Sequence, residues 1–234
     1  MIRSKSGKTA IAIFVKTPGL SRVKTRLGHK VGELKAKKFY ELSLKKIKFE
    51  INELKKSIGH DKLDVYWAIA EPLAPFHTLY WKDFNFIHQK GNELGTRISG
   101  VYNQLINFGY EKVVLMGGDS PQLTSDDYKH WCGSIVKGKQ VIMGPANDGG
   151  FYTFIGAAPI SQKLWEGVNY SQSTTCQQLD EQLSDDGFSV FYLNKQMDID
   201  FYEDLAPLKG ALLSSNKSSV EQKALIDYIS TINN

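Results

Sequence analysis

The chain has 234 residues, of which 41% are hydrophobic and 23% are charged, and this balance suits a globular protein with a substantial core. It excludes a disordered or collagen-like chain, and no run approaches the ~18 apolar residues that a membrane span needs. The apolar run at residues 10–15 is too short for a signal-peptide core. Cys132 and Cys176 form neither a metal motif nor a disulfide framework, so we expect a cytoplasmic protein.

The net charge of +4 hides a strong asymmetry along the chain. Residues 1–60 carry 16 Lys and Arg against 4 acidic residues, whereas residues 61–234 carry 13 against 21. A nucleic-acid-binding module could produce this pattern. An enzyme that grips phosphates with its first segment and a cation with later carboxylates would produce it as well.

In chain order, strands and helices are predicted to alternate. Apolar, β-branched or aromatic runs predict strands over residues 10–15, 63–69, 84–88, 113–116, 141–143, 151–155 and 188–193. Amphipathic spacing predicts helices over residues 29–58, 94–108, 126–136, 174–183 and 220–229. The nine lysines of residues 29–58 are expected mostly on solvated faces. The alternation predicts one α/β domain, with a mostly parallel central sheet flanked by helices.

Ligands of open α/β sheets bind beyond the carboxyl ends of the strands, so the loops there are the places to look for chemistry. The first such loop places four cations in eleven positions, at Lys16, Arg22, Lys24 and Arg26. Lysine offers a compact charge and arginine a two-pronged donor, and both suit phosphate oxygens. The loop therefore predicts a phosphate site, with a solvated basic loop as the alternative.

Carboxylates follow two later strands. Asp119 comes after Gly117 and Gly118 at the tip of an apolar strand, where it could coordinate a divalent metal that bridges phosphates. A turn aspartate that caps the next helix is the alternative. Asp198 and Asp200 share one side if their segment is extended, although they could instead form an N-cap pair for a helix beginning near Phe201.

Two further loops carry suitable side chains. Asp148, in the segment 144–152, could bind sugar or acceptor hydroxyls, but Asn-Asp-Gly-Gly between two strands is also strong hairpin chemistry. Gly95 and Arg97 open a helix in a way that fits a nucleotide-contacting loop. No Ser/His/Asp order, HExxH motif or Cys/His pattern is present, so hydrolase and zinc chemistry are not expected.

Several of these segments occur together in one order that resembles a known family. They are Lys16-x-Pro18, Val23-Lys24-Thr25-Arg26-Leu27, Leu94-Gly95-x-Arg97, Gly118-Asp119-Ser120-Pro121, Gly144-Pro145, Asp148-Gly149-Gly150-Phe151-Tyr152 and Asp198-x-Asp200. The set resembles the bacterial glycosyltransferase-like family often found beside radical-enzyme and selenium-associated domains. That family is placed in the nucleotide-diphospho-sugar transferase superfamily. The match covers about residues 10–205, and residues 24–27 are also similar to the basic loop of phospholactate guanylyltransferases.

The resemblance implies a GT-A-like fold for one domain over residues 1–234, with a C-terminal helix near residues 220–230. It implies that Lys16, Lys24 and Arg26 hold nucleotide phosphates, and that Gly95 and Arg97 lie near the nucleotide. Asp119 would be the main metal ligand, Asp198 or Asp200 would complete the metal site, and Asp148 would lie near the transferred group or acceptor. The chain departs from the family where Ser21 replaces a glycine, and where residues 170–174 only loosely echo a Trp-Ser-Thr segment.

Together these observations predict a transferase that depends on Mg²⁺ or Mn²⁺ and moves a glycosyl group from a nucleoside-diphosphate sugar to a small acceptor. Asp119 and Asp148 are its predicted catalytic residues. Nucleotidyl transfer from a nucleoside triphosphate is the alternative, because so many cations suit a triphosphate. A nucleic-acid-binding module is a less favoured reading. A further alternative is a homologue that binds a nucleotide and catalyses no reaction.

Overall fold

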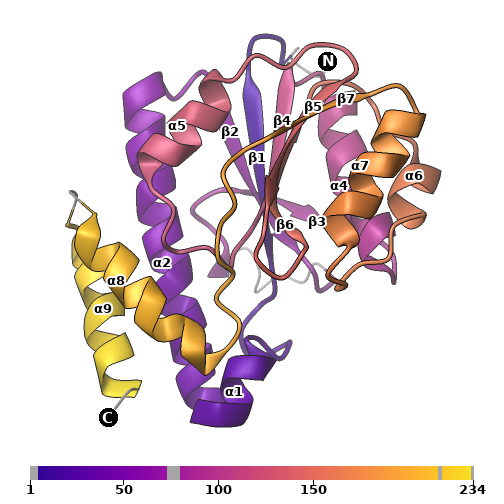
Figure 1. Cartoon of the computed structure of the whole chain (residues 1–234). Helices are drawn as coiled ribbons and strands as arrows, with labels where there is room; N and C mark the ends of the chain where they lie inside the picture. The colour runs from indigo at the N-terminus through magenta and orange to yellow at the C-terminus, as the bar shows by residue number, and fades with distance from the viewer. Residues whose placement is uncertain (1–4, 73–79, 216–217, 233–234) are drawn as a thin grey trace.

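The computed structural model describes residues 5–72, 80–215 and 218–232. Within these ranges seven strands form one sheet with helices on both sides (Figure 1). The strands are β1 (Thr9–Val15), β2 (Leu63–Ile69), β3 (Asn85–His88), β4 (Lys112–Gly117), β5 (Gln140–Pro145), β6 (Phe151–Gly156) and β7 (Ser189–Tyr192). They lie in the order β3-β2-β1-β4-β6-β5-β7. β6 pairs antiparallel with both of its neighbours, whereas the other pairs are parallel.

The helices form two layers. On one side of the sheet lie α2 and α5, with α8 and α9 packed outside α2, and on the other side lie α4, α6 and α7 (Figure 1). Their bounds are α1 (Thr25–Val31), α2 (Glu33–Ile58), α4 (Leu94–Asn107), α5 (Ser125–Gly133), α6 (Gln162–Glu166), α7 (Thr175–Asp185), α8 (Leu205–Ser214) and α9 (Val220–Ile232). A short 3-10 turn, η1 (Tyr202–Asp204), precedes α8. The predicted fold class, a single α/β domain with a mostly parallel sheet, is confirmed.

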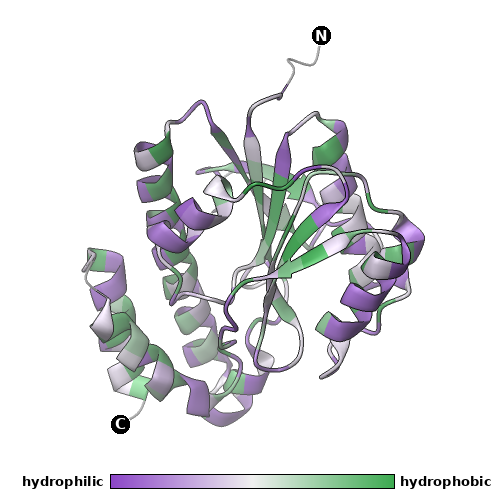
Figure 2. Ribbon diagram, turned by 45° about the horizontal axis from the view of Figure 1, so that its top comes forward, coloured by the Kyte–Doolittle hydropathy of each residue, from purple (hydrophilic) through white to green (hydrophobic). Residues whose placement is uncertain are grey.

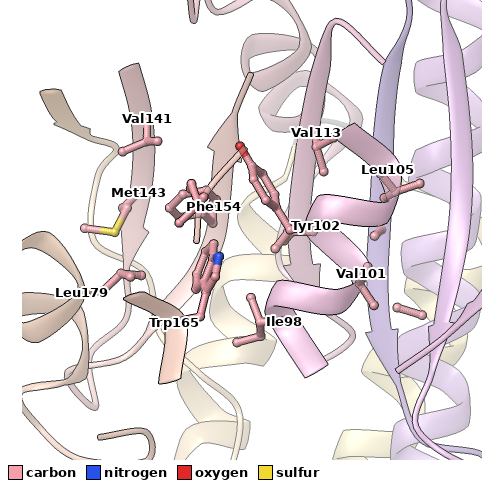
Figure 3. Close-up of a cluster of buried hydrophobic side chains, with 14 of the residues drawn as sticks. Ile98, Val101, Tyr102, Leu105, Val113, Val141, Met143, Phe154, Trp165 and Leu179 are labelled. Atoms are coloured by element: carbon pink, nitrogen blue, oxygen red, sulfur yellow. The ribbon is translucent and has the colours of Figure 1, made fainter. Parts of the chain in front are cut away.

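Alternation along the strands places side chains on two separate cores. Ile11 and Ile13 of β1 pack with α2 and α5, whereas Ala10 and Ala12 face α4, α6 and α7. In the second core, three aromatic side chains join α4, β6 and α6 (Figure 3): Tyr102, Phe154 and Trp165. The centroids of their rings lie 4.9–5.8 Å apart. Hydrophobic residues line the strands and the sheet-facing sides of the helices (Figure 2).

A third apolar cluster joins the two ends of the chain. It forms between α1, α2, α8 and α9 around Leu27, Phe39, Leu208 and Ile229, each of which is fully buried. The predicted single helix over residues 29–58 is wrong at its start. Gly32 has a φ of +89°, which ends α1 and starts α2 in a new direction. None of the helices in the described ranges is long and apolar enough to cross a membrane.

One lysine of α2 is buried, against the general expectation for its lysines. Lys46 donates to the Leu123 carbonyl at 2.5 Å and pairs with Glu50 at 3.3 Å, and both side chains are almost completely excluded from solvent. Glu50 also accepts a hydrogen bond from the backbone of Ser125 at 2.7 Å. This buried pair ties α2 to the loop that leads from β4 to α5.

Candidate active site

Parallel pairing brings the tips of the central strands to one edge of the sheet. Phe14 of β1 stands opposite Gly117 of β4, and Val15 stands opposite Ile69 of β2. Two pockets lie at this edge, and they share five lining residues: Phe14, Leu94, Asp119, Ser171 and Asp200. Together they form one cleft with two parts.

The two parts differ in charge. The acidic pocket, of about 290 Å³, has four carboxylates in its wall and, among the described residues that line it, no Lys, Arg or His; the carboxylates are Asp119, Asp148, Asp198 and Asp200. The basic pocket, of about 530 Å³, is lined by five cations, Lys16, Arg22, Lys24, Arg26 and Arg97. The site residues predicted from the sequence are thereby brought to one cleft, with the exception of Gly95.

Lys24 lies at the border between the two pockets. Its ammonium contacts Asp119 Oδ1 at 2.6 Å, the Ile199 carbonyl at 2.6 Å and Asp200 Oδ1 at 3.5 Å, and its side chain is only 3% exposed. Its backbone is left-handed, with a φ of 47°, at the residue before α1. The three donors of the ammonium therefore point at protein oxygens, and the basic loop is joined directly to the aspartate at the tip of β4.

The carboxylate of Asp119 does not cap the helix that follows it, α5. Thr124 and Asp127 form a reciprocal capping box at the start of α5, so another residue does that work. Asp119 is half exposed, at 51% of its side chain, and it lines both pockets. Its one ion pair among the described residues is the contact with Lys24.

Asp198 and Asp200 are likewise not the caps of the following helical turn. The carboxylate of Asp204 accepts the backbone N–H groups of Asp200 and Phe201, at 2.9 and 2.7 Å. Asp200 instead pairs with Arg26 at 2.9 Å and turns toward the basic loop. The N-cap alternative for this pair is therefore excluded.

Asp148 occupies the predicted hairpin turn and also lines the acidic pocket. It accepts the Gly150 N–H at 2.8 Å, between the antiparallel strands β5 and β6, so the turn interpretation holds as well. Burial, together with the charges of Asp148, Asp200 and Asp119, raises the pKa of Asp198 to about 7. One buried oxygen of Asp198, Oδ2, has no hydrogen-bond partner among the described residues.

Glu71 is a residue that the sequence reasoning missed. Both of its carboxylate oxygens accept the backbone N–H of Thr17, at 3.0 and 2.9 Å, and Ser21 also hydrogen-bonds to it. Burial raises the pKa of Glu71, but these hydrogen bonds outweigh it and leave the pKa below its usual value. Ser21 thus helps to anchor the basic loop. Glu71 comes two residues after β2, so its position at the same edge could have been predicted.

The remaining predicted residues lie in different settings. Lys16 is exposed and lines the basic pocket, as does Arg97, whose Nε donates to the Gly91 carbonyl at 2.8 Å. Gly95 lines neither pocket and is buried behind the wall of the acidic one. A Cβ at Gly95 would stand 2.5 Å from the Trp165 carbonyl oxygen, which gives this glycine a packing role between α4 and α6.

The chemistry of the donors fits a hard divalent cation. Four carboxylates meet at one cleft, and a buried oxygen of one of them has no hydrogen-bond partner in the described part of the chain. Within the described ranges, however, no three His, Cys, Asp or Glu side chains are grouped so that they could hold a metal ion by themselves. Mg²⁺ commonly takes one or two carboxylates and completes its shell with substrate phosphates and water. The carboxylates therefore suit an ion that the substrate phosphates help to hold, and they do not form a complete metal site by themselves.

The fold is shared with solved structures of a suggested nucleotide-diphospho-sugar transferase and of a cytidylyltransferase. The chain belongs to the family described as "Uncharacterized protein conserved in bacteria (DUF2064)", whose sequence model matches residues 56–172. A comparison with curated proteins finds no match.

Solved structures share the architecture. A Desulfovibrio desulfuricans protein, for which nucleotide-diphospho-sugar transfer is the suggested activity, is 24% identical with a TM-score of 0.83, over 98% of this chain and 96% of that one. A cytidylyltransferase from Leptospira borgpetersenii is 14% identical with a TM-score of 0.51, over 99% and 94%. A 4-diphosphocytidyl-2C-methyl-D-erythritol synthase from Anaerococcus prevotii is 13% identical with a TM-score of 0.54, over 88% and 97%. At these identities the likeness concerns the fold.

Proposed function

We propose that this protein is a transferase that binds a nucleoside-diphosphate sugar across the two pockets and passes the sugar to a small acceptor. The observation that carries the proposal is the two-part cleft, in which a cationic pocket meets a carboxylate pocket at the Lys24–Asp119 contact. A nucleoside-diphosphate sugar is divided in a complementary way, because its anionic diphosphate suits the cationic pocket and its hydroxyl-bearing sugar suits the carboxylate pocket.

The basic pocket would hold the diphosphate. Lys16 and Arg97 make no ion pair with a described residue, so their charges are available to phosphate oxygens. Lys24 already has protein oxygens around its ammonium, and we assign it the role of positioning Asp119 and Asp200 beside the phosphates. Glu71 holds the backbone of the loop, which keeps these groups in place before the substrate arrives.

Asp119 would hold Mg²⁺ or Mn²⁺, with Asp198 or Asp200 as a second ligand. When bound, such an ion neutralises charge on the diphosphate as it leaves. Asp148 lines the acidic pocket but not the basic one, and one of its oxygens is fixed by the Gly150 N–H, so it would orient the acceptor hydroxyl or take its proton.

A second candidate is nucleotidyl transfer, in which a nucleoside triphosphate reacts with release of pyrophosphate. Five cations around one pocket can accommodate three phosphates, and the cytidylyltransferase fold is shared. The two activities are separated by a direct contest. The protein is incubated with labelled pyrophosphate and each nucleoside triphosphate, and in parallel with UDP- and GDP-sugars. Pyrophosphate exchange without sugar-nucleotide turnover would replace our first proposal with the second.

The role of Asp119 is tested by Asp119→Asn, with Asp227→Asn on α9 as the matched control at an exposed site away from the cleft. We expect Asp119→Asn to weaken Mn²⁺-dependent nucleotide binding at least about tenfold, whereas the control binds as the parent does. Isothermal titration with and without Mn²⁺ measures this. Asp119→Asn also removes a counter-charge from the buried ammonium of Lys24, so we expect a lower melting temperature without nucleotide, and binding is compared at a temperature at which both variants are folded. Unchanged metal-dependent binding in Asp119→Asn would refute the assignment. If Asp119→Asn and the control both bind the nucleotide, and 200 mM salt abolishes that binding in both, the nucleic-acid alternative would be favoured.

A further inference from the structure

The acidic pocket gives the proposed function a substrate class. We infer that it takes a sugar that bears hydroxyl groups and neither carboxylate nor phosphate, so that the enzyme rejects uronic-acid donors and phosphorylated sugars at this position. The inference rests on the proposed function, because it assumes that the diphosphate lies in the basic pocket and the sugar beside it.

Charge is the first argument. Of the four carboxylates in the wall, Asp119 and Asp200 are paired with Lys24 and Arg26, on the side of the basic pocket. Asp148 and Asp198 have no cationic partner among the described residues. A second anion in this pocket would face the hydrogen-bonded pair of Asp148 and Asp198, which carries net negative charge, with no Lys, Arg or His in the described wall to receive it. Like charges placed together in one pocket oppose binding.

Shape and surface chemistry are the second argument. Apart from the carboxylates, much of the lining is apolar or aromatic, and it includes Phe14, Ile98, Met116, Phe151 and Tyr170. A sugar ring has both hydroxyl groups, which carboxylates accept from, and C–H surfaces, which aromatic rings pack against, so a lining with both kinds of side chain suits it. The volume of about 290 Å³ lies just below the range of roughly 300–1,000 Å³ that is usual for small-molecule pockets. It suits one ring better than a longer saccharide.

A polar segment between α6 and α7 supplies the remaining contacts. Ser171 and Gln172 line the pocket, and the Gln172 amide makes no side-chain hydrogen bond with a described residue. That amide offers both donors and an acceptor, as recognition of hydroxyl groups requires, without a net charge. Gln172 is thus the position in the wall where a cation could be placed with the least disturbance to the carboxylates.

The test compares donors that differ by one charged group. UDP-glucose is paired with UDP-glucuronate, and GDP-mannose with GDP-mannuronate, and UDP and GDP alone serve as baselines. Isothermal titration in Mn²⁺ is carried out on the full chain, on Gln172→Lys and on Gln177→Lys. Gln177 is exposed on α7 and lines neither pocket, so its variant adds the same charge outside the site.

We expect the neutral donor of at least one pair to bind at least about tenfold more tightly than its acid, with that ratio reduced in Gln172→Lys and retained in Gln177→Lys. Equal or tighter binding of the acid by the parent protein would overturn the inference and leave the proposed function standing. An equal effect of the two lysine variants would also overturn it. If neither sugar nucleotide binds differently from its nucleoside diphosphate, the sugar does not reach the pocket, and the proposed function fails together with the inference.

Discussion

The buried pair of Lys46 and Glu50 provides a quantitative test of how the Asp119 loop is held. We consider Lys46→Met, Glu50→Gln and the double variant. Lys46→Met leaves Glu50 without a counter-charge in a site that is closed to water, and Glu50→Gln does the same to Lys46. Burial already lowers the pKa of Lys46, with Glu50 acting in the opposite direction, so the charged ammonium depends on its partner.

The magnitude follows from the position of the pair. Removal of one partner from a buried ion pair costs about 3–5 kcal/mol, because a charge is left unpaired. Lys48→Met is the matched control on the same helix. Lys48 pairs with Asp83 at 3.0 Å, but both side chains are more than a third exposed, and such a pair contributes at most about 1 kcal/mol. The double variant should cost about 0.5–3 kcal/mol less than the sum of the single ones.

Urea unfolding at neutral pH measures these free energies, provided that the slope against denaturant is unchanged. Two results would refute the reasoning. One is a loss for Lys46→Met that is no larger than the loss for Lys48→Met. The other is strict additivity of Lys46→Met and Glu50→Gln, which would mean that the two groups do not act on each other.

Two further predictions concern the anchors of the cleft. Because the pKa of Glu71 is lowered in the folded protein, its contribution to stability is present above its unfolded pKa of about 4.5 and is lost as the pH falls below that value. The unfolding free energy of the parent should therefore fall more steeply on acidification than that of Glu71→Gln. Parallel pH profiles of the two proteins would contradict this prediction. Gly95→Ala should lower the unfolding free energy by about 1–3 kcal/mol, because its Cβ meets the Trp165 carbonyl, whereas Gly100→Ala on the same helix has room and should be neutral or stabilising in the same urea titration.

The positions of the strands could be predicted because most of them are apolar on both faces. Residues 113–116 form a wholly apolar run, and they lie in the middle of the sheet as β4. The loops at the strand tips then follow from the parallel topology alone. For that reason the sequence alone predicts that Asp119 and the cations of the first loop lie at one edge of the sheet.

Other features depend on contacts that a pattern does not contain. The break at Gly32 lies inside an otherwise helical pattern, and the buried state of Lys46 depends on the Leu123 carbonyl, which is 77 residues away in the chain. The motif around Gly95 predicts a place near the nucleotide, but in the fold its neighbours are Trp165 and Tyr170. The metal dependence and the association with radical-enzyme domains stay predictions.

The charge asymmetry of the chain becomes an asymmetry of the cleft. Cations come from the loop and helix that follow β1 and from α4, and carboxylates come from the loops after β4, β5 and β7. Because β1 and β4 are neighbours, the border between the two charges runs through the contact of Lys24 with Asp119. A ligand that bridges this border must match positive charge on one side and negative charge on the other within a few ångströms. A diphosphate joined to a neutral sugar satisfies that condition with a shared cation at the junction, whereas a uniformly anionic ligand such as a nucleic-acid backbone satisfies only half of it.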